Sequence, residues 1–372
     1  MFFTSLQLTH FRNYPHLQAD FCAGINCITG PNGSGKTNVL EALHYLAFTR
    51  GIRSHQDKQA LKDGEDFFLL EGNLQEGEEK ALVQCNFLKS KGKKLFINRV
   101  PAAKMSDHIG RIPLVAIMPD DTELINGPSA GRRRFMDMLI SQYSPAYLHH
   151  LIQYDKLLLR RNAQLKLFAE QRYFDREQLQ LWNEQMLPHG RAISEERNTF
   201  LEAFFPIFET YFHQIVSEKE QPSIRYRSQL EVNTEAGWQE VYATWEARDL
   251  ANCYTGVGTH RDDLVFQIDG TSVRNYGSQG QQKTFVIALK LAQYQLLEQH
   301  KQLAPILLLD DLFDKLDEFR LGEIAGILTD RVKGQVFITD TSRQNLEKVF
   351  SSLTDRAVNY YRVLQGDFQP GT

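Results

Sequence analysis

The chain has 372 residues, of which 42% are hydrophobic and 24% are charged, and its formal net charge is −4. This length allows two domains with cores of their own, and the composition is that of an ordinary globular protein. No apolar run approaches the ~20 residues that span a bilayer, the first residues lack the basic region of a signal peptide, and the net charge leaves any nucleic-acid binding to a local basic patch.

The cysteines indicate a reducing compartment. None of the four belongs to a C-x-x-C pair, which argues against zinc and redox motifs. They lie in apolar, strand-like stretches, as small buried side chains do. We therefore expect a cytoplasmic protein. The cysteines are Cys22, Cys27, Cys85 and Cys253.

Strand patterns dominate the first 120 residues. The first three patterns resemble a β meander, with a turn at residues 11–15. The later ones are joined by charged, glycine-bearing hairpin loops, which predicts an antiparallel β lobe. Strands are predicted at residues 5–8, 16–21, 25–29, 67–72, 81–87, 94–98 and 114–118.

Residues 30–37 form a complete G-x-x-x-x-G-K-T phosphate loop. A strand pattern precedes it and apolar residues at helical spacing follow at 38–46, which is the context this motif requires. The glycines let successive N–H groups point at one phosphate, and the helix adds the positive end of its dipole. We predict that Lys36 contacts the β- and γ-phosphates and that the Thr37 hydroxyl holds Mg²⁺. The predicted nucleotide contacts are Gly30, Pro31, Asn32, Gly33, Ser34, Gly35, Lys36 and Thr37.

Helical periodicity dominates from residue 131 to about residue 211. Breaks are predicted at Ser144-Pro145, at Pro188-His189-Gly190 and at Pro206. The segment has no sustained heptads, so it predicts a helical subdomain and not a long coiled-coil arm.

Strand patterns return at residues 223–227 and 263–268, and Asp269-Gly270 follows as a hairpin turn. We expect an α/β fold. We expect three parts, with residues 1–125 carrying the phosphate loop and the β lobe, 126–222 forming a mainly helical inserted domain, and 223–372 forming the C-terminal part.

Residues 306–311 form a continuously apolar strand that ends in two carboxylates. Such a run suits a parallel strand buried on both faces, and ligand chemistry gathers at the carboxyl ends of those strands. We predict that Asp310 holds Mg²⁺ and that Asp311 orients or activates the attacking water.

A second anion site is predicted at Ser278, which opens an amphipathic stretch and lies 310 − 278 = 32 positions before Asp310. Its hydroxyl is predicted to contact phosphate together with Gly280 and Gln281. Lys36 and Asp310 are 310 − 36 = 274 positions apart, which is too far for a small nucleotidase or kinase core. Because one ATP needs only one phosphate loop, the second site suggests that it serves the nucleotide of another subunit.

The phosphate loop, an S-x-G-Q signature and a strand ending in two aspartates resemble the ABC-type ATPase heads. The resemblance is closer to the RecF family, the bacterial recombination and gap-repair proteins, and it extends in order over nearly the whole chain. The motifs that carry it are Phe11-Arg12-Asn13-Tyr14, Gly33-Ser34-Gly35-Lys36-Thr37-Asn38, Gly131-Arg132-Arg133-Arg134-Phe135, Thr259-His260-Arg261-Asp262-Asp263 and Gly277-Ser278-Gln279-Gly280-Gln281-Gln282-Lys283.

The resemblance implies an ABC-ATPase-type head with a mixed or parallel central sheet and an antiparallel β lobe. It implies an ATP- and Mg²⁺-dependent homodimer, in which residues 30–37 of one subunit and 278–281 of the other surround each nucleotide. That dimer would clamp gapped DNA or a single-strand/double-strand boundary and, with RecR and RecO, aid RecA loading and the SOS response. Slow hydrolysis would release it. Residues 314–317 resemble the D-loop of such heads.

Two departures from the ATPase class matter. The usual second-acid glutamate is the shorter Asp311, consistent with slow turnover. The switch histidine is absent, and Thr339 or Thr341 is the candidate replacement. The equivalent of the glutamine loop lies near Pro119-Asp120-Asp121 but is not assigned to one residue.

Two basic clusters are candidate DNA contacts, and each has an ordinary alternative. Arg132, Arg133 and Arg134 could bind phosphate or open a solvated helix. Lys91, Lys93 and Lys94 could bind DNA or form a soluble loop tip.

The histidines outside the nucleotide motifs are not predicted to be catalytic or metal-binding. The His260-Arg261-Asp262-Asp263 run favours a structural or interface ion-pair role near the signature over catalysis, because adjacent strand residues point in different directions. His149, His150 and His300 have no partners at metal-ligand spacing and are predicted to be surface histidines.

Three other classes fit less well. A chromosome-maintenance ATPase with long arms would need a coiled coil. A transporter subunit would need the signature ~100 positions after the phosphate loop, whereas here 278 − 36 = 242 positions separate them. A metabolic kinase gives no reason for the second serine-glycine site.

Overall fold

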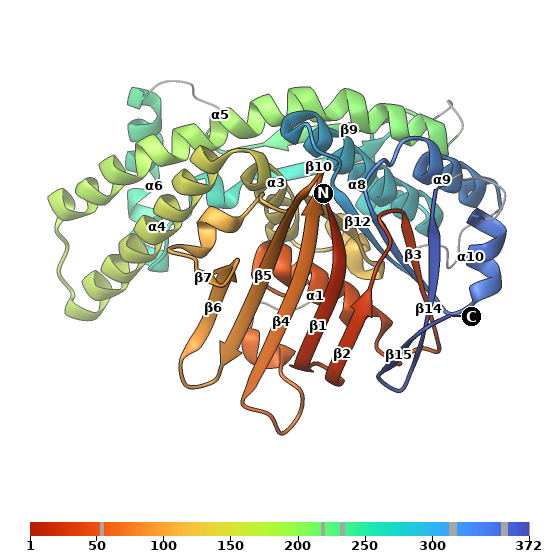
Figure 1. Cartoon of the computed structure of the whole chain (residues 1–372). Coiled ribbons are helices and arrows are strands. Elements are labelled where there is room, and N and C mark those ends of the chain that lie inside the picture. The colour runs from red at the N-terminus through yellow and green to blue at the C-terminus, as the bar shows by residue number, and fades with distance from the viewer. Residues whose placement is uncertain (53–55, 217–219, 231–234, 312–317, 351–355, 372) are drawn as a thin grey trace. The chain divides into compact units, whose positions relative to one another are not determined.

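The computed structural model describes the chain except for residues 53–55, 217–219, 231–234, 312–317, 351–355 and 372 (Figure 1). The chain divides into two compact units. The first comprises residues 1–121, 211–218 and 283–372, and the second comprises residues 122–210 and 219–282. The second unit is therefore longer than the predicted insertion, because it also takes in residues 223–282. Among the described residues, no helix is both long and apolar enough to cross a membrane.

A six-stranded antiparallel sheet forms the lobe of the first unit, in the order β2-β1-β4-β5-β6-β7 (Figure 1). The predicted lobe is confirmed, but the predicted meander is wrong in its third strand. β3 (Ile25–Thr29) is buried at all five residues, so it suits a sheet covered on both faces and joins the other sheet. The lobe strands are β1 (Phe2–Phe11), β2 (Tyr14–Asp20), β4 (Phe67–Glu76), β5 (Glu79–Leu88), β6 (Gly92–Ile97) and β7 (Val100–Pro101).

The second sheet of this unit has the order β15-β14-β3-β13-β12-β8, with parallel pairing from β14 to β8 and an antiparallel edge at β15. Because β13 lies between β3 and β12, the carboxyl ends of these three strands meet at one edge. Helix α1 contacts strands of both sheets. The remaining strands are β8 (Leu114–Ile117), β12 (Ile306–Asp310), β13 (Val336–Asp340), β14 (Val358–Leu364) and β15 (Asp367–Pro370).

The first unit also contains α-helices and short 3-10 helices. They are α1 (Lys36–Phe48), α8 (Gln279–Lys301, within this unit from Lys283), α9 (Glu318–Asp330), α10 (Arg343–Phe350) and the short η1 (Asp57–Ala60), η2 (Met105–His108) and η3 (Pro119–Thr122, whose last residue falls in the second unit).

The second unit is mainly helical and carries a three-stranded antiparallel sheet, β11-β10-β9. Ser144 caps α4, accepting a hydrogen bond from the Tyr147 N–H with Pro145 at the first turn, as the predicted break requires. The elements are α2 (Glu123–Asn126), α3 (Ser129–Tyr143), α4 (Pro145–Gln171), α5 (Arg176–Ile215, within this unit to Thr210), β9 (Pro222–Arg227), α6 (Glu235–Asn252), η4 (Thr259–Arg261), β10 (Asp263–Ile268), β11 (Thr271–Ser272) and α7 (Val273–Tyr276).

The two other predicted helix breaks are wrong. Pro188 and Pro206 both lie inside α5. Buried neighbours such as Met186, Leu187 and Phe208 hold the helix together by packing, which outweighs the hydrogen bond that each proline removes. The Thr210 hydroxyl donates to the Pro206 carbonyl at 2.8 Å.

Candidate nucleotide-binding site and signature turn

The phosphate loop joins β3 to α1 in the first unit. Gly35 has φ = 116°, in the left-handed region, and a Cβ at Gly35 would lie 2.5 Å from Asn13 Nδ2. A Cβ at Gly30 would lie 2.2 Å from the Val363 carbonyl oxygen. Both positions therefore need glycine, one for its backbone conformation and both for the close approach of neighbouring atoms.

Lys36 is 4% exposed, and its Nζ donates to the carbonyl oxygens of Gly30 at 2.8 Å and Pro31 at 3.2 Å. The ammonium thus lies over the loop. Ser34 Oγ is buried and has no hydrogen-bond partner among the described residues. A cradle of left-handed glycines with a buried cation and an unpaired hydroxyl fits a phosphate group.

The predicted magnesium ligands lie together. Thr37 Oγ1 donates to Asp310, with distances of 2.8 Å to Oδ1 and 2.9 Å to Oδ2, and Thr339 Oγ1 donates to Oδ1 at 2.7 Å. Asp310 is 2% exposed. One carboxylate and a neighbouring hydroxyl are oxygen ligands of the type that Mg²⁺ takes, with its other positions left to phosphate and water. These residues therefore fit the predicted metal.

Asp311 follows directly at the end of β12 with φ = 44°, a left-handed conformation that costs a non-glycine residue about 1 kcal/mol or more. Its N–H donates to Thr339 Oγ1 at 3.1 Å. Thr339, one of the two candidates for the switch position, thus bridges Asp311 and the predicted magnesium ligand Asp310.

The turn between β1 and β2 braces the phosphate loop. Asn13 Nδ2 donates to the Ser34 carbonyl at 3.0 Å, and the Tyr14 hydroxyl donates to the Gly35 carbonyl at 3.1 Å. Burial raises the pKa of Tyr14 well above its ordinary value, so the phenol keeps the proton that it donates. Arg12 makes a bidentate ion pair with Glu41 of α1, at 2.9 and 2.6 Å. The sequence predicted only a turn at this segment. The Phe-Arg-Asn-Tyr motif was the feature that could have indicated its contacts with the phosphate loop.

In the second unit, Ser278 opens α8 with a reciprocal capping box. Ser278 Oγ accepts from the Gln281 N–H at 3.2 Å, and Gln281 Oε1 accepts from the Ser278 N–H at 2.9 Å. Gln281 Nε2 also donates to Glu220 Oε1 at 3.0 Å. The predicted helix start is present, and Gly280 lies in its first turn.

Comparison with known proteins agrees with this geometry. The family model described as the RecF/RecN/SMC N terminal domain matches residues 2–363. A relative from Flavobacterium johnsoniae, named DNA replication and repair protein RecF, is 42% identical over 352 residues, which cover 95% of this chain and 97% of the relative. The protein of the same name from Parabacteroides distasonis is 38% identical over 372 residues, which cover 100% of this chain and 99% of that relative.

The chain belongs to the RecF family.

Solved structures give the same result for the fold. A structure of the recombination mediator protein RecF with ATP, described within the RecFOR pathway, has a TM-score of 0.89 at 27% identity and covers 100% of this chain and 97% of its own. An Smc head bound to the C-terminal winged-helix domain of ScpA has a TM-score of 0.59 at 14% identity, covering 100% of this chain and 97% of its own. The ABC-ATPase head fold of the RecF family is thus confirmed.

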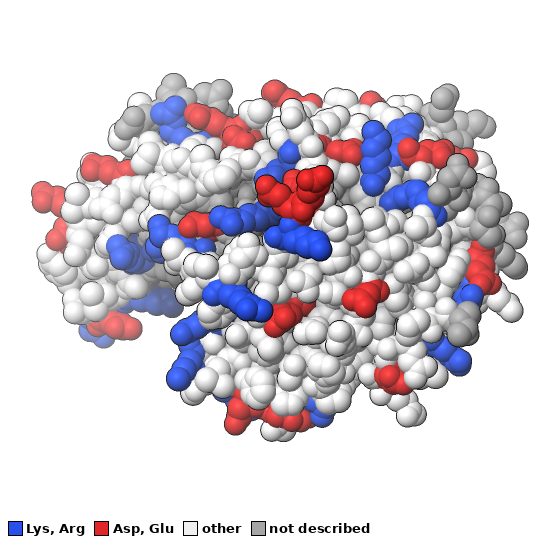
Figure 2. Space-filling model, viewed as in Figure 1, with Lys and Arg blue, Asp and Glu red and all other residues white. Residues whose placement is uncertain are grey.

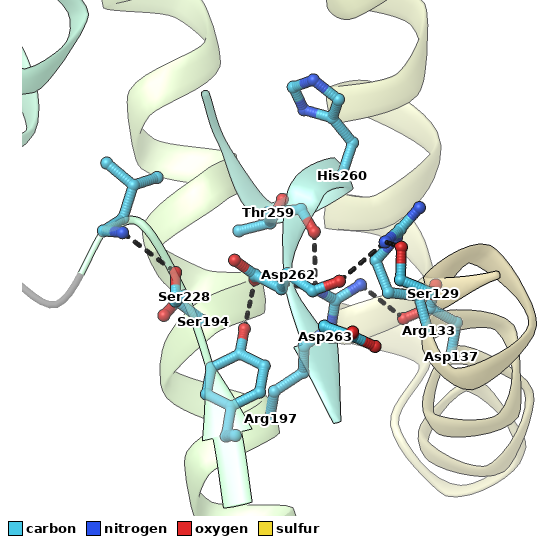
Figure 3. A network of polar contacts seen from close by, with 12 residues as sticks. Ser129, Arg133, Asp137, Ser194, Arg197, Ser228, Thr259, His260, Asp262 and Asp263 are labelled. Carbon is cyan, nitrogen blue, oxygen red and sulfur yellow. Dashed lines mark hydrogen bonds and ion pairs between the residues drawn. The ribbon is translucent and has the colours of Figure 1, made fainter. Parts of the chain in front are cut away.

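The family motif at residues 259–263 forms a buried polar network (Figure 3). Arg197 NH1 donates to Asp262 Oδ2 at 3.0 Å and its NH2 to Asp137 Oδ1 at 2.8 Å. The Tyr226 hydroxyl donates to the same oxygen of Asp262. Arg133 NH1 donates to the Asp262 carbonyl at 2.7 Å. The structural ion-pair interpretation of this motif is therefore confirmed.

Arg132 connects this network to the signature turn. It is 5% exposed and pairs with Asp263 at 2.7 Å, and its NH1 donates to the carbonyls of Leu124 and Gly127 at 3.1 and 3.0 Å. Leu124 lies on the short helix α2, and at the end of that helix Asn126 Nδ2 donates to Gln282 Oε1 at 2.9 Å. A chain of bonds thus runs from β10 to the start of α8.

Three of the six predicted DNA contacts are already used inside the protein. Arg132 and Arg133 belong to the network above, and Lys93 Nζ donates to Asp57 Oδ1 at 2.9 Å and to the Thr49 carbonyl at 2.5 Å. Arg132 and Lys93 are paired with carboxylates, and Arg133 NH1 donates to the Ser129 hydroxyl and the Asp262 carbonyl. These internal contacts weigh against a DNA contact at the three positions. Lys91 and Lys94 are exposed, while Arg134 is half-buried and has contacts of its own. On the face in Figure 2, basic and acidic side chains lie among many uncharged ones.

Two other sequence interpretations need comment. His150 Nδ1 lies 2.9 Å from His189 Nδ1, so His150 has a partner that its local spacing did not reveal. No group of three histidine, cysteine or acidic side chains in the described part of the chain is arranged to hold a metal ion. The predicted D-loop, Asp314-Lys315-Leu316-Asp317, lies outside the described residues.

Proposed function

We propose that this protein is an ATP-dependent DNA-binding protein of DNA replication and repair. The observation that carries the proposal is the convergence of Lys36, Thr37 and Asp310 at one edge of the parallel sheet, with Ser34 Oγ left without a partner among the described residues. The names of the relatives, DNA replication and repair protein RecF, and the ATP-bound RecF structure support the same function.

The residues have separate roles in this proposal. Lys36 and the N–H groups of residues 30–37 bind the phosphates of ATP. Thr37 and Asp310 hold Mg²⁺, which neutralises charge on the phosphates. Asp311 orients the water that attacks the γ-phosphate, and its short side chain makes this ATPase slow and its hydrolysis a release step.

The signature turn completes the site of a neighbouring subunit. Ser278, Gly280 and Gln281 contact the γ-phosphate held by residues 30–37 of a second copy. ATP therefore joins two subunits around gapped DNA or a single-strand/double-strand boundary in the cytoplasm. RecR and RecO are the expected partners, in RecA loading and the SOS response. The description of the similar ATP-bound RecF structure within the RecFOR pathway supports these partners.

A complementation experiment tests the shared site. Lys36→Ala removes the phosphate cation, and Ser278→Arg blocks the signature turn. Sedimentation with ATP and Mg²⁺ is expected to give dimers for the unaltered protein and monomers for each variant alone. A mixture of the two variants is expected to form dimers again, because one intact loop then faces one intact signature. A mixture that stays monomeric contradicts a site shared between subunits.

The DNA role has its own test. ATP is expected to strengthen binding to gapped duplex at fixed salt, with Lys36→Ala insensitive to ATP. Equal affinity with and without ATP would remove the clamp role while leaving nucleotide binding intact.

A further inference from the structure

The signature glutamine is fully engaged inside its own subunit. Gln281 Oε1 accepts from the Ser278 N–H at 2.9 Å, while Gln281 Nε2 donates to Glu220 Oε1 at 3.0 Å. Both ends of the amide are therefore satisfied. For Gln281 to reach a nucleotide on another subunit, these bonds must first open.

Glu220 is held where it can make this contact. The next residue, Gln221, exchanges two hydrogen bonds with Asp269 after β10. The Gln221 N–H donates to Asp269 Oδ1 at 3.0 Å, and the Asp269 N–H donates to the Gln221 carbonyl at 2.9 Å. The segment carrying Glu220 is thus fixed to the sheet of its own unit, so little entropy is lost when Glu220 binds Gln281.

The carboxylate of Glu220 is incompletely satisfied. Oε2 is buried and has no hydrogen-bond partner in the described part of the chain. A buried carboxylate oxygen without a hydrogen-bond partner costs free energy in this state. Its position beside the first turn of α8 also sets a negative charge where an incoming phosphate would bind, at the positive end of the helix dipole.

We propose that Glu220 is a positioning residue that keeps the signature turn closed on itself and thereby limits the affinity of one subunit for the ATP held by another. This inference rests on the proposed shared site. The γ-phosphate and Glu220 compete for the same end of α8, and the incoming anion displaces Gln281 from Glu220. The dimer therefore forms only when the nucleotide carries a γ-phosphate that can displace Glu220 from Gln281.

Two substitutions separate charge from hydrogen bonding. Glu220→Gln removes the charge and keeps an amide oxygen that can accept from Gln281. Glu220→Ala removes both. Glu240→Gln is the matched control, because Glu240 is an exposed acid on α6 of the same unit, and the change alters net charge equally.

The first measurement needs no nucleotide. Amide hydrogen exchange of the peptide that contains residues 276–284 is expected to rise about fivefold in Glu220→Ala, because the capping box is no longer held. Exchange is expected to stay unchanged in Glu240→Gln. Unchanged exchange in Glu220→Ala would show that Glu220 does not hold the turn, and the proposal would fail.

The second measurement is the dissociation constant of the dimer in ATP and Mg²⁺. Removing one like charge near the phosphate is expected to lower it about tenfold in Glu220→Gln, with no change in Glu240→Gln. If the Glu220→Gln dimer has a dissociation constant equal to or higher than that of the unaltered protein, Glu220 does not compete with the γ-phosphate. If the unaltered protein forms no ATP-dependent dimer, the shared site is refuted, and competition is refuted with it. The exchange measurement still decides whether Glu220 holds the turn.

Discussion

Replacing Arg12 with methionine removes the cation that neutralises a buried carboxylate. The Glu41 side chain is 2% exposed and the Arg12 side chain is 22% exposed, and two hydrogen bonds of 2.9 and 2.6 Å join them. Removing one partner of a buried pair costs about 3–5 kcal/mol. Because Arg12 is partly solvated, we expect the lower end, about 3 kcal/mol.

At roughly 2 °C or slightly more for each kcal/mol in a chain of this size, the loss corresponds to a fall of about 6 °C in Tm. Thermal unfolding of the nucleotide-free protein measures it. Lys58→Met is the control, because Lys58 is an exposed cation in the neighbouring η1.

A double-mutant cycle separates the pair from its surroundings. In Arg12→Met/Glu41→Leu no buried charge remains, so we expect most of the lost stability to return, with a coupling of about 2 kcal/mol. Additive losses in the double variant would refute the reasoning, because they would mean that Glu41 does not depend on Arg12.

Three further predictions concern the metal site, one buried histidine and the lysine hairpin. Asp310→Asn is expected to weaken ATP binding in Mg²⁺ by about tenfold or more and to leave binding in EDTA unchanged, as measured by calorimetry. Burial lowers the pKa of His260 to about 4 from 6.5, so the unfolded chain binds more protons in this interval. Stability is therefore complete above pH 6.5 and falls by up to about 3 kcal/mol as the pH drops to 4, a loss that urea titrations of His260→Gln should not show. Lys91→Ala is expected to reduce the salt dependence of DNA binding, whereas Lys93→Ala is expected to lower thermal stability, and the opposite pattern would refute the ion-pair assignment of Lys93.

The tautomer of neutral His260 follows from its two hydrogen bonds, whereas burial is what lowers its pKa. Its Nε2 lies 3.0 Å from the Thr255 carbonyl, which can only accept, so Nε2 carries the proton. Its Nδ1 then accepts from the Tyr154 hydroxyl at 3.0 Å.

The sequence by itself determined the local chemistry of the nucleotide site. The phosphate loop at 30–37 and the carboxylates at 310–311 are contiguous motifs, and each requires a strand end or a helix start that hydrophobic periodicity reveals. Their meeting could be inferred because carboxyl ends of parallel strands share an edge. The capping box of Ser278 and Gln281 is equally local, since its partners are three positions apart.

Tertiary structure alone decided which charges remain available to a ligand. Arg132 and Asp263 are 131 positions apart, and Lys93 and Asp57 are 36 apart, so no local pattern shows that these cations are already paired. The same holds for Arg12 with Glu41 and for Glu220 with Gln281. Long-range packing also explains why α5 continues past Pro188 and Pro206 and why β3 belongs to the parallel sheet. In each case the outcome depends on partners distant in the chain, and burial makes those contacts strong enough to override local preference.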